Sequence, residues 1–207
     1  PEIAETLAVE IKKKYPTLYQ IGYGPFLRKN KIFDLNVFGN GEGKILSHIL
    51  NQTRGSLYLD CSTKDFNRIP FLTLDSVIHP VSLPDFDYIW YSRGCPHHCR
   101  FCVLPSFSQG RKIYRSSRLF VDEMKYRRDH YGVKDFYITD STFNSSTSKL
   151  KKICRDIQAA DLGVSWRCDC RIDFINPEQL TLLSDAGCNY LKLGVEAMND
   201  NRLKFMN

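Results

Sequence analysis

The chain has 207 residues, of which 43% are hydrophobic and 13% aromatic, so it can bury a core and does not have the composition of a disordered protein. No apolar run reaches the roughly 18 residues that a membrane-spanning helix needs, and no basic-then-apolar signal segment opens the chain. A cytoplasmic protein without a membrane partner is therefore expected. The net charge of +6 is moderate and does not by itself identify a nucleic-acid partner.

Strand and helix patterns alternate over residues 1–50. Apolar residues at four-residue spacing predict a helix over residues 3–14, and residues 18–25 and 32–43 have the composition of short strands that end in glycine turns. The next segment, "KILSHILNQ", predicts a short amphipathic helix. This alternation is typical of an α/β domain.

Residues 51–85 have a different composition from the segments on either side. Their periodicity is weak, and Pro70, Pro80 and Pro84 interrupt them repeatedly, as in connecting segments. We therefore expect an interdomain linker, with Cys61 as an isolated thiol within it.

Four strand-helix units follow over residues 86–207. Strands are expected at 88–94, 135–140, 163–172 and 190–197, and helices at 119–131, 147–160 and from Asn176 to Ala186. The last helix has a strong start, because Asn176 can cap it and Pro177 stands in its first turn. Repeats of about 30 residues are typical of parallel (β/α) barrels, so we predict the first part of such a barrel. Because the chain opens at Pro1 without an initiating Met and stops soon after the last strand, we expect a fragment.

Polar residues gather where the predicted strands end. A cysteine loop follows the first strand, and Asp140, Arg171 and Glu196 end the second, third and fourth strands. In parallel barrels the carboxyl ends of the strands form one rim, which carries the functional residues. The sequence therefore predicts an active site on that rim.

The cysteine loop has the spacing Cys95-x3-Cys99-x2-Cys102. Eight cysteines in a long, periodic chain favour reduced thiols over a disulfide scaffold. A structural zinc site would need a fourth ligand, such as His97 or His98. An iron-sulfur cluster held by three thiolates would instead leave one iron open to another ligand, as a catalyst requires. By their helix and strand positions, Cys154, Cys168, Cys170 and Cys188 are expected to be core residues.

The segment "SRGCPHHCRFC", with Phe101 just before the last cysteine, resembles the signature of radical S-adenosylmethionine (SAM) enzymes. Together with "RSSRLFVDEMKYRRDHYGVKDFYITDSTFN", "VSWRCDCRIDFI" and "LLSDAGCNYLKLGVEA", in that order, it resembles the cobalamin-binding branch of that superfamily. This resemblance covers about residues 86–207. Residues 1–50 resemble the end of a Rossmann-like cobalamin-binding domain, in which Gly22 and Gly24 would approach the nucleotide tail of cobalamin.

The resemblance implies a cofactor set. Cys95, Cys99 and Cys102 would ligate three irons of a 4Fe-4S cluster, and the fourth iron would chelate the amine and carboxylate of SAM. The flanking Arg93 and Arg100 could raise the potential of the cluster electrostatically, but solvated side chains without that role are the favoured interpretation.

The same resemblance implies which residues surround SAM. Phe101 would lie near the adenine and Glu196 near the ribose, whereas Arg171 and Asp140 would lie near the methionine or the substrate. The cobalt-ligating motif of the family, Asp-x-His-x-x-Gly, is not in this sequence, so cobalamin is expected only in the intact protein.

The implied reaction is reductive cleavage of SAM followed by radical modification of an unactivated carbon, through methyl transfer or a rearrangement of a small-molecule substrate. A flavodoxin or ferredoxin would supply the electron. Two alternatives stay open: a cobalamin-independent radical enzyme that modifies RNA, supported by the basic runs, and a zinc-bound nucleic-acid-binding module. The strand-helix repeat argues against the zinc module, because such modules are small and need no barrel.

Overall fold

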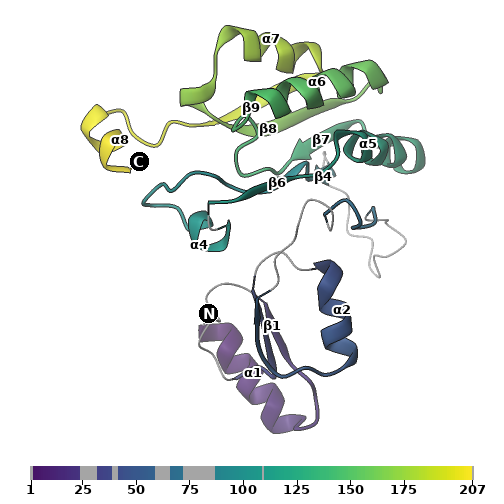
Figure 1. The fold of residues 1–207 in the computed structure, drawn as a ribbon, viewed down its shortest axis with the longest axis vertical. Helices are drawn as coiled ribbons and strands as arrows, with labels where there is room; N and C mark the ends of the chain where they lie inside the picture. The colour runs from purple at the N-terminus through teal and green to yellow at the C-terminus, as the bar shows by residue number, and fades with distance from the viewer. Residues whose placement is uncertain are drawn as a thin grey trace. The chain divides into compact units, whose positions relative to one another are not determined.

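A computed structural model describes residues 2–23, 32–38, 42–58, 66–71, 87–108 and 110–206. The chain divides into two compact units, Pro1–Ile69 and Pro70–Asn207 (Figure 1). Within the described residues, no helix is both long and apolar enough to cross a membrane.

The first unit is a small parallel sheet with two helices. Its elements are α1 (Glu2–Lys14), β1 (Ile21–Tyr23), β2 (Leu35–Phe38), α2 (Glu42–Leu50) and β3 (Gly55–Tyr58). The strand order is β1-β2-β3, and both pairs are parallel. Leu35 and Val37 are fully buried at its centre. Lys12 of α1 donates to Asp34 at 2.7 Å and holds the pKa of that carboxyl below its usual value, which ties the helix to the start of β2.

Two features of this unit differ from the sequence analysis. β3 lies inside the expected linker and pairs with all four residues of β2, so the first unit extends past residue 50. A strand of four residues is too short to show an alternation in the sequence. Gly22 lies within β1, paired with Asn36, rather than in a turn. Gly24 and Cys61 lie outside the described residues.

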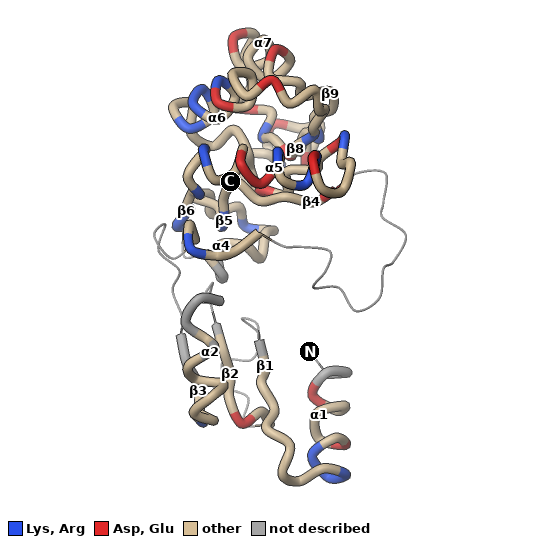
Figure 2. Tube along the Cα trace, turned by 90° about the vertical axis from the view of Figure 1, so that its right-hand side faces the viewer, with Lys and Arg blue, Asp and Glu red and all other residues tan. Residues whose placement is uncertain are grey.

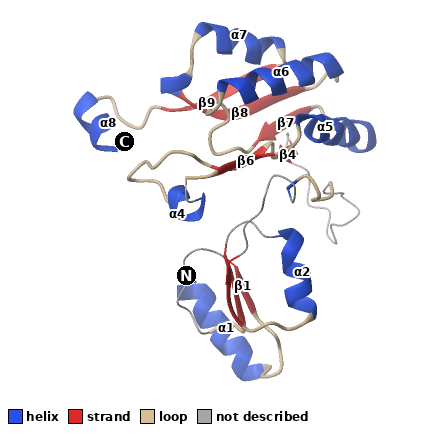
Figure 3. Ribbon diagram, viewed as in Figure 1, coloured by secondary structure: helices blue, strands red, loops and turns tan. Residues whose placement is uncertain are grey.

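The second unit contains the predicted parallel sheet. Its strands are β4 (Asp87–Ile89), β7 (Asp135–Ile138), β8 (Ser165–Arg171) and β9 (Cys188–Gly194), in the order β4-β7-β8-β9 (Figure 3). The connecting helices are α5 (Ser117–Tyr131), α6 (Thr147–Ala160) and α7 (Pro177–Asp185). All neighbouring strands in this sheet run parallel, which confirms the partial (β/α) barrel.

The cysteine loop is carried by a separate two-stranded ribbon. β5 (Ser92–Gly94) and β6 (Lys112–Tyr114) pair antiparallel, and α4 (Leu104–Ser108) lies between them in the chain. The single strand predicted over 88–94 is therefore broken between β4 and β5. Gly94 has a φ of 84°, and a Cβ there would lie 2.2 Å from the carbonyl oxygen of Arg111, so only glycine allows this close approach.

One face of the sheet packs against the three helices. On β8 the side chains of Trp166, Cys168 and Cys170 are buried on this face, and they share a hydrophobic core with Phe120 and Ile153 from the helices. Trp166 also donates its indole N–H to the carbonyl of Ala186 at 2.7 Å.

The expected core position of Cys154 is confirmed, and burial raises the pKa of its thiol to about 12. Cys168 and Cys170 are confirmed as core residues as well. Cys188 is half-buried and packs against the same core. All four are free thiols, and Cys154, Cys168 and Cys170 are buried.

The caps of two helices provide a matched test of local stability. The side chain of Asn176 accepts a hydrogen bond from the backbone N–H of Gln179 at 2.9 Å. Ser146, at the start of α6, makes no such hydrogen bond from its side chain to the backbone N–H groups of the helix. Asn176→Ala should lower the free energy of unfolding by about 1 kcal/mol. Ser146→Ala should change it by less than about 0.5 kcal/mol. Urea unfolding monitored by circular dichroism measures both, and equal losses would contradict this assignment of the caps.

Candidate functional site

A pocket of about 500 Å³ lies at the carboxyl ends of β8 and β9, facing the cysteine loop. Its size is within the range of small-molecule and cofactor sites. Among its lining residues are Cys95, Cys99, Cys102, Phe101, Arg171 and Glu196. The structure thus brings together the predicted site residues of the barrel, with the exception of Asp140.

Asp140 lies beneath the cysteine loop instead. Its side chain is 1% exposed, and its carboxylate accepts hydrogen bonds from the backbone N–H groups of Tyr91 and Ser92 at 3.0 and 2.8 Å. The hydroxyl of Ser92 donates to its second oxygen. Burial raises the pKa of Asp140, and the ammonium of Lys112 is the largest opposing influence. The carboxylate therefore fixes the junction of β4 and β5, from which the loop departs.

Each of the three loop sulfurs has a polar neighbour. The guanidinium of Arg171 donates to Sγ of Cys99 at 3.1 Å, and the backbone N–H of Leu104 donates to Sγ of Cys102 at 3.4 Å. The hydroxyl of Thr142 lies 3.7 Å from Sγ of Cys95 and donates to the carbonyl of Ser141 at 2.7 Å. Hydrogen bonds and positive charge stabilise thiolates, the form that binds iron.

Arg171 is held in place by two neighbours. Its guanidinium makes two hydrogen bonds to the carboxylate of Asp173, at 2.9 and 2.6 Å, and this pairing lowers the pKa of Asp173. The side-chain amide of Asn144 both accepts from the backbone N–H and donates to the carbonyl of Arg171, each at 2.9 Å. The sequence analysis missed Asn144, because a single Asn in a loop carries no pattern that predicts buried hydrogen bonds to a distant backbone.

Glu196 lines the other end of the pocket in an unusual backbone conformation. Its φ is 62°, a left-handed value that costs a non-glycine residue about 1 kcal/mol or more. A Cβ on Gly194 would lie 2.5 Å from its carboxylate oxygen, so glycine makes room for this side chain. Backbone strain of this kind often marks functional positions.

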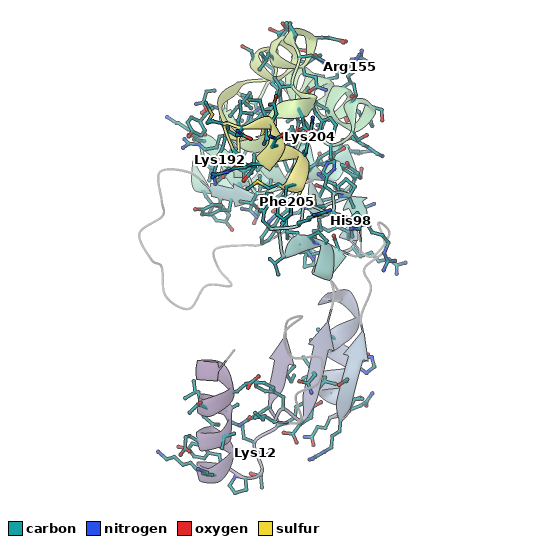
Figure 4. The ribbon with its side chains drawn as sticks, turned by 90° about the vertical axis from the view of Figure 1, so that its left-hand side faces the viewer. Lys12, His98, Arg155, Lys192, Lys204 and Phe205 are labelled. Atoms are coloured by element: carbon teal, nitrogen blue, oxygen red, sulfur yellow. The ribbon has the colours of Figure 1, made fainter. Side chains whose placement is uncertain are left out.

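Two further charged residues on the pocket wall were missed by the sequence analysis. Asp169 of β8 and Lys192 of β9 are paired in register, and Lys192 lies 4.0 Å from the Asp169 carboxylate. Tyr137 of β7 donates its hydroxyl to Asp169 at 2.7 Å. Lys192, which is labelled in Figure 4, lines the pocket. The alternation along β8 could have indicated Asp169, because it lies on the face of the strand opposite to Cys168.

The two arginines that flank the cysteines each lie over an aromatic ring. Arg93 lies over the ring of Trp90 at 5.6 Å, and Arg100 over Phe205 of α8 (Asp200–Met206) at 5.1 Å. Figure 2 shows basic residues around β5, β6 and α4. Of these cations, Lys112 of β6 is near Cys95, and Arg171 reaches Cys99 from β8.

The two histidines of the loop do not join the thiols. His97 stacks on Phe174 with ring centroids 5.2 Å apart, its Nε2 has no hydrogen-bond partner, and burial lowers its pKa. The ring of His98 lies against Gly110. Across the described residues, no three His, Cys, Asp or Glu side chains are arranged to hold one metal ion. The mixed Cys-His zinc set is therefore not preassembled there.

The family model of the Radical SAM superfamily matches residues 90–207. The bacteriochlorophyllide d C-12(1)-methyltransferase of Chlorobaculum tepidum is 29% identical over 56% of this chain. The anaerobic magnesium-protoporphyrin IX monomethyl ester cyclase of Rubrivivax gelatinosus is 30% identical over 61%. This chain covers only 26% and 22% of their lengths.

Among solved structures, the chain is similar to TsrM of Kitasatospora setae, a radical SAM methyltransferase with cobalamin and a [4Fe-4S] cluster bound. That match has 26% identity and a TM-score of 0.54, over 57% of this chain and 22% of TsrM. A second TsrM structure, with tryptophan and a SAM analogue, matches 97% of this chain and 45% of TsrM, with 18% identity and a TM-score of 0.71, and shows the shared fold. These matches confirm the resemblance to the cobalamin-binding branch.

The position of Asp140 predicts a structural effect. Asp140→Ala should lower the free energy of unfolding by about 2–4 kcal/mol, because it leaves two buried backbone N–H groups and one hydroxyl without an acceptor. Asp122→Ala is the control. Asp122 is half-exposed, and its ion pair to Arg118 on the same helix is long at 3.8 Å and exposed, so its loss should cost little. Urea unfolding followed by tryptophan fluorescence measures both. A loss for Asp140→Ala no larger than that of the control would remove Asp140 from this role.

Proposed function

The chain belongs to the radical SAM superfamily, and from this premise we propose that it is the cluster-binding part of an enzyme that cleaves SAM reductively and modifies an unactivated carbon of a small molecule. One observation carries the proposal: three free thiols line a single pocket together with Arg171 and Glu196. The zinc alternative needs a histidine beside the thiols. Instead, His97 stacks on Phe174 and the ring of His98 lies against Gly110.

The residues present fit a 4Fe-4S cluster held by Cys95, Cys99 and Cys102. The donor set is chemically right, since thiolates bind iron and each sulfur has a polar neighbour. A cuboidal cluster places its ligands on separate irons, so three thiols spread around a pocket suit it although they do not converge on one point. When bound, the cluster supplies one electron to the sulfonium of SAM.

The same pocket offers the chain's own contacts for SAM. Phe101 is 55% exposed beside Cys102 and presents an aromatic surface for the adenine. Glu196 offers a carboxylate that can accept hydrogen bonds from ribose hydroxyls. Arg171 lies beside Cys99, where it can bind a carboxylate and keep the methionine end near the thiols. Asp140 would act only indirectly, through the position of the loop.

For the outcome of the reaction we favour methyl transfer, because a methyltransferase and a radical SAM methyltransferase structure are among the similar proteins. The similarity to a cyclase keeps a rearrangement as the second candidate. Cobalamin is a further candidate cofactor, because TsrM has cobalamin bound, and Gly22 and Gly24 are the residues of this chain that we predict near its nucleotide tail. The enzyme would work in the cytoplasm and receive its electron from a flavodoxin or ferredoxin.

Anaerobic reconstitution of the intact protein with iron and sulfide tests this function. We expect about four irons per protein, a change in the electron paramagnetic resonance signal when SAM is added, and 5′-deoxyadenosine after reduction with dithionite. Stoichiometric zinc without iron would overturn the proposal. If the protein binds iron but its electron paramagnetic resonance signal does not change when SAM is added, the inference that one iron is open to SAM would be wrong.

The cysteines should divide into two classes. Alanine in place of Cys95, Cys99 or Cys102 should remove most of the bound iron, because two thiolates cannot hold the cluster stably. Alanine in place of Cys154 or Cys168 should retain the iron and cost roughly 1 kcal/mol of unfolding free energy, since it deletes only a small buried group.

Iron per protein is the measurement for this series. Loss of bound metal in His97→Ala or His98→Ala would favour the mixed Cys-His, zinc-type site. Loss of iron in Cys168→Ala or Cys170→Ala would indicate an auxiliary cluster on the core face of β8.

Glu196 can be tested separately from the cluster. Glu196→Ala should weaken SAM binding by about 1–3 kcal/mol, because the ribose hydroxyls lose their acceptor, while iron content stays unchanged. Glu196→Gly is the informative partner variant, since glycine tolerates the left-handed φ and also lacks the carboxylate. Isothermal titration with SAM under anaerobic conditions measures both. Wild-type affinity in Glu196→Gly would show that only the backbone conformation matters.

A further inference from the structure

Lys112 has no role in the function described above, yet the fold places it directly behind the cysteine loop. It lies on β6 and pairs with Gly94, the residue before Cys95. This antiparallel pairing fixes its distance from the loop, because β5 and β6 form one ribbon.

The ammonium of Lys112 points toward the pocket wall. It donates a hydrogen bond to the carbonyl of Thr142, a residue that lines the pocket. The hydroxyl of Thr142 lies 3.7 Å from Sγ of Cys95. One residue therefore separates the lysine charge from the first loop thiol.

The ammonium of Lys112 lies in a partly buried place between Asp140 and the loop. Burial lowers the pKa of Lys112, whereas the charges of Asp140, Cys95 and Cys170, in that order, favour its charged form. Asp140 already accepts three hydrogen bonds from Tyr91 and Ser92. A cation in a partly buried place acts over a longer range than an exposed one, because water screens it less.

We propose that Lys112 is an electrostatic positioning residue, whose ammonium behind Cys95 makes the cluster held by the three thiols easier to reduce. The inference rests on the proposed function, since it needs a cluster at those thiols. Reduction adds one electron from the reductant and no bond forms or breaks, so a nearby positive charge stabilises the reduced state. Arg171 acts from the side of Cys99.

The test uses the intact, anaerobically reconstituted protein and a redox titration monitored by electron paramagnetic resonance, with iron content measured first. Lys112→Gln keeps a hydrogen-bond donor for Thr142 but removes the charge, and Lys112→Arg keeps the charge. Lys149→Gln is the matched control, because Lys149 and Lys112 lie over the same Tyr114 ring, at 5.4 and 5.3 Å, but Lys149 is exposed on α6.

We expect Lys112→Gln to lower the ratio of reduced to oxidised cluster at least tenfold at a fixed potential, a shift of about 59 mV for a one-electron couple. Lys112→Arg and Lys149→Gln should stay close to wild type. Equal potentials in Lys112→Gln and Lys149→Gln, with full iron in both, would overturn the inference while leaving the proposed function intact. A wild-type protein that binds no cluster would overturn the proposed function itself.

A further variant guards against a folding effect. Should Lys112→Gln lose iron, Lys112→Met tests the same loss of charge with an apolar side chain of similar length.

Discussion

The buried carboxylate of Asp140 determines where the cysteine loop begins. It follows the end of β7 and accepts from the backbone N–H groups of Tyr91 and Ser92, which lie 49 and 48 positions earlier in the chain. These hydrogen bonds fix the place at which β5 leaves the parallel sheet, and the packing of Tyr91 against Phe120 and Phe143 supports them.

The second unit also contains a buried network of ion pairs on α5. Glu123 of α5 is almost completely buried and pairs with both Arg115 and Arg127, and Arg127 continues to Asp87 at 2.7 Å. This network joins β4, α5 and the end of the ribbon. Buried charges are tolerated only when they are paired and hydrogen-bonded, so the network also specifies how the helix meets the strand. Lys112 lies on the same ribbon, where it pairs with Gly94, the residue before Cys95.

Much of the fold could be predicted from the sequence because its signals are local. The alternation of strands and helices after residue 86 follows from apolar spacing, and the cap at Asn176 from four adjacent residues. The parts that were missed depend on contacts between distant segments: the short strand β3, the break between β4 and β5, and the clamp of Asn144 on Arg171. Asp140 was found as a polar strand end, but which way its carboxylate turns is decided by backbone groups far away in sequence.

The strict alternation along β8 has a consequence for how this chain can vary. Trp166 and Cys168 are buried in the core with the helices, Asp169 and Arg171 line the pocket, and Cys170 contributes to both. Insertion or deletion of one residue within this strand would exchange the two faces, turning Trp166 and Cys168 away from the core and burying the charges of Asp169 and Arg171 among apolar side chains. We therefore expect natural variation in length to accumulate in the connections on either side, while β8 itself keeps a constant number of residues.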